Sequence, residues 1–321
     1  MIALDDLISF CKNPLGHFVK QVHGISLSDN DSDQAATLPL ELGRWDGPKL
    51  AGDLLQRMRM HVGDAAAQER AKWDWVAAVQ NTGQLPLGAY GQVIVEEMQA
   101  LVDEIVRQCA AKQRPLADGQ EVPVQLQLLN GRSIAGVVPG VHTSAGGTAS
   151  IVQVFCEANK VPEMMAMWVR MLALCAVGGP QLTDAWTIGM NPDEHAKSFA
   201  YVAKFAAAGF GPPAALAALQ ELVVLYEEAC TQPRPMFGAT AEKLLEEPVK
   251  AKGAFQSFVF GIKPYHAELL VYGERLRFSE IYPSGGANEV FFRALFGLRQ
   301  RTITVGNDRA RAAPRSTRQT K

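Results

Sequence analysis

A change in the period of the hydrophobic pattern constrains the fold of this chain more than any other feature. In VPVQLQLL, residues 122–129, apolar and polar side chains alternate, as in a strand with one buried face. Asn130-Gly131 follows and strongly favours a hairpin, because both turn residues must accept positive φ. With further strands predicted at 132–138 and 149–155, we expect three adjacent antiparallel strands and a helix at 161–177 packed on one face.

Helical periodicity dominates much of the remaining chain. Two short helices are predicted within residues 1–23, and others at 49–62, 65–80, 88–112, 193–208, 213–230 and in NEVFFRALFGL, with a short strand at AWTIGM. Residues 26–37 are polar and turn-rich, which indicates a loop. We therefore divide the chain into a helical part at 1–115, a sheet core with flanking helices at 116–300, and a basic, disordered tail at 301–321.

Composition narrows the class of protein without naming a partner. Hydrophobic residues make up 48% of the 321 residues, enough for a sizeable core, and the net charge of −2 favours no particular ligand. The five cysteines are widely spaced and form no CxxC pair, which fits a reducing compartment. The amphipathic, acidic start is unlike a signal peptide, and no apolar run reaches the roughly 20 residues of a membrane span. We expect a cytoplasmic protein that does not enter a membrane.

Motifs with recognised chemistry are missing from the sequence. It contains no GxxxxGK[ST] and no GxGxxG phosphate loop, and the six histidines lack HExxH spacing. The acidic pair Glu96-Glu97 falls on a predicted amphipathic helix, where a solvated face is the simpler interpretation. We therefore predict no catalytic, cofactor-binding or metal-binding residues, and no cofactor.

Four segments, in the right order, resemble one family. They are LDDLISFCKNPLGHFVKQVHGISL, GQLPLGAYGQ, LNGRSIAGV through NKVPEMMAMWVRMLALCAVG, and ALQELVVLYEEACTQPRPMF, and they cover residues 4 to about 237. Together they are similar to the C-terminal domain of the exodeoxyribonuclease V gamma chain, the RecC subunit of the RecBCD helicase–nuclease. The resemblance implies an α/β fold: a restriction-endonuclease-like (PD-(D/E)XK-type) mixed sheet core, flanked by helices, that has lost its active site.

The loss is visible at the positions that would carry the chemistry. In active relatives the second strand holds a metal-binding Asp, where this chain has Ala135. The third strand would hold an acid, a spacer and a Lys, where this chain offers Gln153 and Phe155. Two divalent cations need several hard oxygen ligands, which these side chains do not supply.

The resemblance implies a non-catalytic subunit domain that binds and guides DNA in double-strand-break repair and recombination. Its partners would be DNA and subunits of RecB and RecD type, which would supply cleavage and ATP hydrolysis. One alternative is an active metal-dependent nuclease with displaced ligands at Glu157, Lys160 and Glu96 or Glu97. The other is a protein-interaction scaffold without a DNA role.

Two apolar stretches are candidates for the partner surface. The first is the last helix with its neighbouring aromatic stretch, which comprise Val290, Phe291, Phe292, Leu295 and Phe296, and Phe255, Phe258 and Phe260. The second is the methionine-rich stripe of the 161–177 helix, since Met suits an adaptable packing surface. The simpler interpretation of both is that they close the core.

Overall fold

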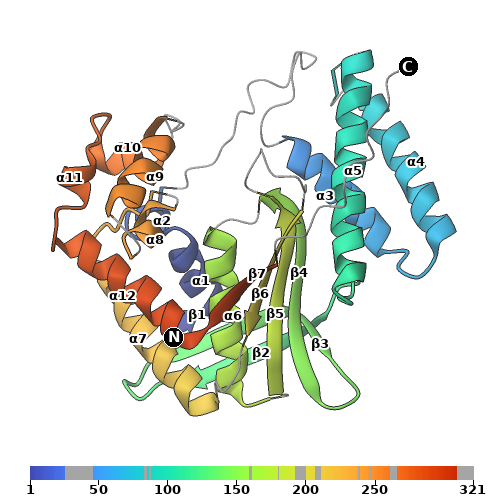
Figure 1. Ribbon diagram of the computed structural model, residues 1–321. Coiled ribbons are helices and arrows are strands. Elements are labelled where there is room, and N and C mark those ends of the chain that lie inside the picture. The colour runs from blue at the N-terminus through green and yellow to red at the C-terminus, as the bar shows by residue number, and fades with distance from the viewer. Residues whose placement is uncertain are drawn as a thin grey trace.

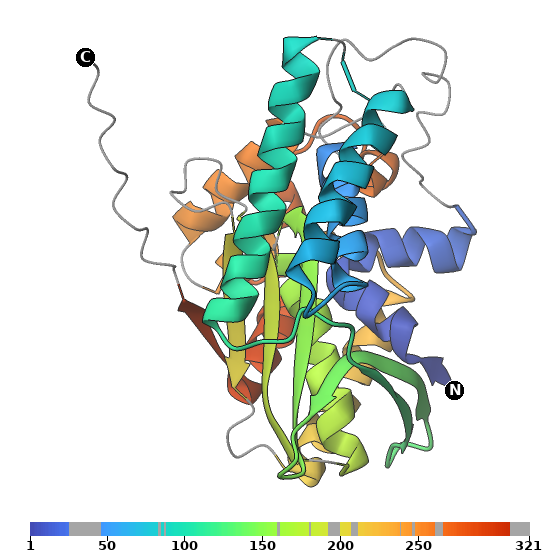
Figure 2. The same ribbon diagram turned by 90° about the vertical axis from the view of Figure 1, so that its right-hand side faces the viewer.

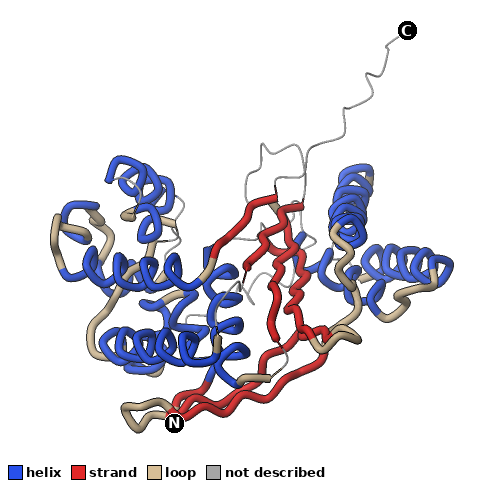
Figure 3. The backbone as a smooth tube through the Cα atoms, turned by 60° about the horizontal axis from the view of Figure 1, so that its bottom comes forward, coloured by secondary structure: helices blue, strands red, loops and turns tan. Residues whose placement is uncertain are grey.

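The fold is mixed α/β, with one sheet between two layers of helices (Figures 1 and 3). A computed structural model describes residues 1–25, 46–82, 85–86, 88–158, 161–179, 181–191, 200–206, 211–237, 239–245, 248–260 and 266–308. No helix in these ranges is long and apolar enough to cross a membrane.

Within these ranges the sheet has seven strands, six of them in the order β1-β3-β4-β5-β6-β7, while β2 pairs with β3. The strands are β1 (Ile2–Ala3), β2 (Gln120–Gln127), β3 (Ser133–Thr143), β4 (Thr148–Ala158), β5 (Gln181–Met190), β6 (Ala200–Ala206) and β7 (Thr304–Asp308). Pairing is antiparallel except for β1 with β3 and β4 with β5, which are parallel. The run β2-β3-β4-α6-β5 is thus an antiparallel meander followed by a helical crossover into a parallel strand.

The helices cover both faces of this sheet. They are α1 (Leu4–Lys12), α2 (Pro14–His23), α3 (Asp46–Arg59), α4 (Ala65–Asn81), α5 (Ala89–Ala111), α6 (Val161–Val177), α7 (Pro212–Ala229), α8 (Thr240–Lys243), α9 (Pro248–Phe260), α10 (Ala267–Tyr272), α11 (Phe278–Ile281) and α12 (Ala287–Thr302). In Figure 2, α4 and α5 lie in front of the sheet, on the face opposite α6.

The alternation of side chains along β4 connects the two cores. Ile151 packs in the larger core with α1, α6, α7 and α12. Its neighbour Val152 packs in the smaller core with α3, α4 and α5. Successive residues of a strand point to opposite faces, so β4 is buried on both sides.

The predicted meander and its crossover helix are confirmed. β2 pairs antiparallel with β3, β3 pairs antiparallel with β4, and α6 begins and ends where the pattern placed it. The hairpin turn differs from the predicted one. The N–H of Gly131 donates to the carbonyl of Leu128 at 3.1 Å, which centres the turn on Leu129 and Asn130. Only Gly131, with φ of 78°, takes up positive φ within this turn.

Two predictions on the C-terminal side are wrong. The helix predicted at 193–208 is a strand where the structure describes it, because residues 200–206 form β6. Tyr201, Val202 and Phe205 favour a strand between two neighbours more than the surrounding alanines favour a helix. The predicted disordered tail is also wrong for residues 301–308, which complete α12 and form β7. Residues 309–321 and the predicted loop at 26–37 lie outside the described residues.

The predicted partner surfaces are largely inside the molecule. Of the five candidates on α12, Phe291, Phe292, Leu295 and Phe296 are buried in the larger core, and Val290 is exposed. Of the aromatic stretch, Phe255 is buried, Phe258 is partly buried and Phe260 is exposed. The methionine-rich stripe of α6 is core as well, since Met167 and Met171 are buried and Met164 is partly buried against the larger core. The prediction of a partner interface on these two faces is therefore wrong, because both faces pack into the core of their own chain.

Candidate functional site

The sheet forks between β3 and β4. These strands pair only at Val141↔Ile151, His142↔Ser150 and Thr143↔Ala149, although β3 begins at Ser133 and β4 ends at Ala158. Upstream of the fork, β1 takes the place of β4 and pairs in parallel with β3. The two long strands of the meander therefore separate where nuclease-like chemistry was sought in the sequence.

Close backbone contacts maintain the fork. Gly140 has φ of 74°, and a Cβ at this position would lie 2.6 Å from the carbonyl oxygen of Val152. A Cβ on Gly119 would lie 2.5 Å from the carbonyl carbon of Gly140. Only glycine fits both positions, because the loop before β2, strand β3 and strand β4 approach one another without room for side chains.

A cavity of about 660 Å³ opens at the fork. Its walls come from the ends of α1 and α3, the loop before β2, strands β3 and β4, and one side of α6. The charged residues that line it are Lys12, Arg59, Asp118, Glu121, Glu157, Glu163 and Arg170. The volume lies within the roughly 300–1,000 Å³ of typical small-ligand sites.

Two of the three cations at this cavity are paired with carboxylates. Lys12 Nζ lies 2.7 Å from Glu163 Oε1, and Arg59 Nη1 lies 3.4 Å from Asp118 Oδ1. Arg59 also donates through Nη2 to the carbonyl oxygen of Val154. This bond satisfies a β4 carbonyl at the fork, where β3 no longer pairs with β4.

Arg170 differs from these two. It lies on α6, it is half-buried, and no hydrogen bond or ion pair links it to another described residue. Its Nε is buried without a partner. Burial lowers the pKa of the Arg170 guanidinium, while the carboxylates of Glu163 and Asp5 raise it. Arginine nevertheless stays protonated in proteins, so the cavity holds a charged group with unused donors.

The positions predicted from the nuclease resemblance separate in space. Gln153 and Phe155 line the cavity, and the Phe155 ring packs over Gly189 of β5, where a Cβ would lie 2.4 Å from it. Ala135 is half-buried between Ala3 of β1 and Gln125 of β2, outside the cavity lining.

The residues of the displaced-ligand alternative are not brought together. Glu157 is exposed at the cavity, whereas Glu96 and Glu97 are exposed on α5, on the opposite face of the sheet. Lys160 lies outside the described residues. Among the residues that are described, no group of three or more His, Cys, Asp or Glu could hold a metal ion.

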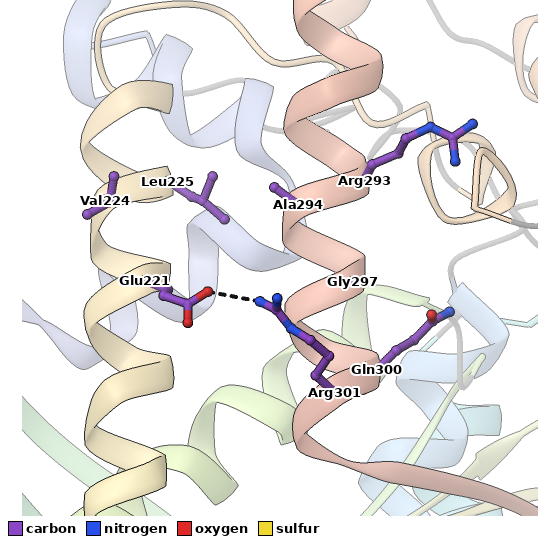
Figure 4. A pocket seen from close by; sticks show the side chains of 8 residues that line it. All are labelled: Glu221, Val224, Leu225, Arg293, Ala294, Gly297, Gln300 and Arg301. Atoms are coloured by element: carbon purple, nitrogen blue, oxygen red, sulfur yellow. Dashed lines mark hydrogen bonds and ion pairs between the residues drawn. The ribbon is translucent and has the colours of Figure 1, made fainter. Parts of the chain in front are cut away.

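A second groove, of about 680 Å³, lies between α7 and α12 (Figure 4). Glu221 of α7 and Arg301 of α12 point toward each other across it, with 2.9 Å between Oε2 and Nη2. Arg293, also on α12, pairs with Glu289 at 2.8 Å. Both arginines of this groove are therefore neutralised within the chain.

Sequence reasoning missed the arginine of the cavity. Within the 161–177 helix the sequence pattern identifies the apolar stripe and gives no signal for Arg170. Its role depends on Lys12 and Arg59, which come from helices far away in sequence and take up the carboxylates nearby. No local pattern reports which partner a side chain lacks.

The fold and the cavity together define a mixed α/β domain whose forked sheet carries charged side chains but no cluster of metal ligands among the described residues. The family model for the RecC C-terminal domain matches residues 1–248, and the chain belongs to this family. Membership implies a role within a RecBCD-type recombination and repair complex. No match to a curated protein is found.

Proposed function

We propose that this chain is a non-catalytic domain of an exodeoxyribonuclease V-type helicase–nuclease, with a restriction-endonuclease-like core. One observation carries the proposal: the β2-β3-β4-α6-β5 run has the meander and crossover that the nuclease resemblance implies, yet the aligned positions hold Ala135, Gln153 and Phe155, which supply no acid or lysine and do not meet in space. The match to the RecC C-terminal domain supports the same assembly.

The chemistry of the cavity agrees with a non-catalytic role. Metal-assisted cleavage of a phosphodiester needs several protein oxygen ligands to hold the divalent ions. At the fork, Glu163 is held by Lys12, and Asp118 lies beside Arg59. Carboxylates already neutralised by cations are poor ligands for a divalent ion, because the cation and the metal compete for the same oxygens.

In the assembly, the domain binds and guides DNA and docks subunits of RecB and RecD type. Those subunits supply the nuclease and ATP-driven steps. The chain's own contribution is binding and positioning in double-strand-break repair and recombination.

The test uses the full chain and a labelled duplex with a forked end, in the presence of Mg²⁺ or Mn²⁺. We expect binding that weakens as salt rises, because phosphate contacts release counterions, and no cleavage. Glu157→Ala should behave like the parent chain in both measurements. Metal-dependent cleavage that disappears in Glu157→Ala would instead establish the displaced-ligand nuclease, and an absence of DNA binding would favour the protein scaffold.

A further inference from the structure

We infer that the cavity at the β3–β4 fork is a receptor for one phosphate group of a DNA strand, and that Arg170 is its principal donor. The inference rests on the proposed DNA-binding function and assigns it a site. Its basis is the combination of an open cavity with a guanidinium that has no partner among the described residues.

The ion pairs of the cavity leave one guanidinium without a hydrogen-bonded carboxylate in the described part of the chain. Glu163 is taken up by Lys12 and Asp118 faces Arg59, so these two pairs cancel. Glu121 and Glu157 also line the cavity but are exposed, so water and salt screen them. Arg170 is left half-buried without a hydrogen-bonded acceptor in the ranges that the structure describes; the carboxylates of Glu163 and Asp5 act on it only through space, so its N–H groups can still bind a phosphodiester oxygen.

Other buried or half-buried arginines show that an unpaired one is unusual in this molecule. Arg234 donates to Glu228, Gln232 and Asn288. Arg299 donates to Glu242, and Arg114 lies 3.2 Å from Asp184. The fold thus supplies acceptors to these guanidiniums, whereas Arg170 lines a cavity and has no hydrogen-bonded acceptor among the described residues.

Phosphate suits these donors better than other anions of a repair complex. The planar guanidinium presents parallel N–H groups that match two oxygens of a phosphate. Lys12 also lines the cavity. If a phosphate displaces the Glu163 carboxylate from Lys12, the ammonium can add a point charge. Gln153 contributes an amide that can donate to a further oxygen.

The experiment compares four forms of the full chain: the parent, Arg170→Gln, Glu163→Gln and Arg301→Gln. Arg301 is the matched control, because it is an arginine already paired with Glu221 in the α7–α12 groove. Binding of a labelled single-stranded oligonucleotide is measured over a series of salt concentrations. Unfolding midpoints are measured in sodium phosphate and in sodium chloride of equal ionic strength.

We expect Arg170→Gln to weaken DNA binding about tenfold, the usual loss for one charge-assisted contact. The slope of log K against log salt should fall by about 0.7, the value for one phosphate contact on a single strand. Glu163→Gln should act in the opposite direction and strengthen binding, since it removes a competing anion. The extra stabilisation by phosphate over chloride should be absent in Arg170→Gln and present in Arg301→Gln.

Unchanged binding and an unchanged salt slope in Arg170→Gln, with phosphate stabilisation intact, would overturn the phosphate receptor and leave the proposed function standing. If the parent chain does not bind DNA at all, the proposed function fails. Loss of phosphate stabilisation in Arg170→Gln would then keep the oxoanion site but reject DNA as its source. If Arg170→Gln does not fold, the Glu163→Gln variant still tests the receptor. DNA binding by Glu163→Gln that is no tighter than that of the parent would reject it.

Discussion

At the scale of single residues, burial makes the cysteines of this chain inert. Cys11, Cys109 and Cys156 are buried, and all five thiols are free. Burial raises the pKa of Cys109 to about 11, and burial together with the nearby Glu157 carboxylate raises that of Cys156 to about 12. Thiolates are the reactive form of cysteine, so these side chains act as small apolar groups at neutral pH.

The raised pKa values predict how stability depends on pH. The folded thiols keep their protons above the pH at which an unfolded thiol, with a pKa near 8.5, loses its own. Stability is therefore fully present below that value and falls as pH rises, by about 2 kcal/mol per thiol between about pH 8 and pH 10. Urea unfolding of the parent and of Cys156→Ala across this range checks it: the variant should show the shallower decline, and identical slopes would contradict the assignment.

The same scale shows what the sequence could and could not predict of the site. Ala135, Gln153 and Phe155 were identified in advance, because a resemblance aligns positions along one strand at a time. Arg170 was not, because its lack of a partner follows from how distant helices distribute their charges. Pairing is a tertiary property, and residue type alone does not encode it.

At the scale of elements, the fork depends on backbone that tolerates no side chain. Gly140 combines φ of 74° with contact to Val152, whereas Gly147, with φ of 77°, has open space where its Cβ would be. The two positions therefore share a backbone conformation and differ in their surroundings. A comparison of the two positions therefore separates two contributions to the free energy of unfolding: the strain of an alanine at positive φ, and the collision of its Cβ with β4.

Alanine substitution at these two glycines should give unequal losses. Gly147→Ala should cost about 1–2 kcal/mol, the price of a left-handed conformation for a residue with a Cβ. Gly140→Ala should cost about 1–3 kcal/mol more, because its Cβ also collides with β4. Free energies of unfolding from denaturant titration measure both. Equal losses would mean that β3 and β4 move apart freely and that the fork is not fixed by this contact.

Helix α12 provides a second comparison between neighbouring positions. Phe292 is fully buried and packs near Tyr282 and Phe296, whereas Val290 is 58% exposed. We expect Phe292→Ala to reduce the free energy of unfolding by about 3–5 kcal/mol. Val290→Ala should change it by less than about 0.5 kcal/mol. Similar, small effects at both positions would show that α12 does not close the core, and would reopen the question of a partner surface there.

Elements with a clear period were predicted well, and those that depend on neighbours were not. The alternation before Asn130 and the stripe of the 161–177 helix are local signals, and both elements are present. β6 was assigned to a helix because alanines surround it, and β7 to a disordered tail because basic residues do. β6 becomes a strand between β5 and β7, and β7 becomes one by pairing with β6; such pairing between distant segments leaves no local pattern.

At the scale of the whole molecule, one sheet joins segments from both ends of the sequence. β1 at residues 2–3 pairs with β3, and β7 at residues 304–308 pairs with β6. The larger core likewise combines α1 with α12. The assignment to a mixed α/β fold was correct, while this closure of the sheet by distant segments was not anticipated.

Removal of β7 should therefore affect the entire molecule. A chain ending at residue 302 keeps α12 but leaves the outer edge of β6 unpaired, from Val202 to Ala206. Each ladder hydrogen bond lost should cost about 0.5–1.5 kcal/mol, and the open edge should promote association. Size-exclusion chromatography with light scattering checks the second effect. A chain ending at residue 308 is the control and should elute like the full chain; the same elution for both shortened chains would contradict the role of β7.

During synthesis the sheet cannot be completed until β7 has emerged to pair with β6. During synthesis β6 emerges well before β7, and at about 5–20 residues per second the interval between Ala206 and Thr304 lasts roughly 5 to 20 seconds. Throughout that interval the nascent chain presents an open strand edge beside apolar surface that α12 has yet to cover. The ribosome-bound chain is thus open to mispairing until β7 emerges, and protection by a chaperone matters most in those seconds.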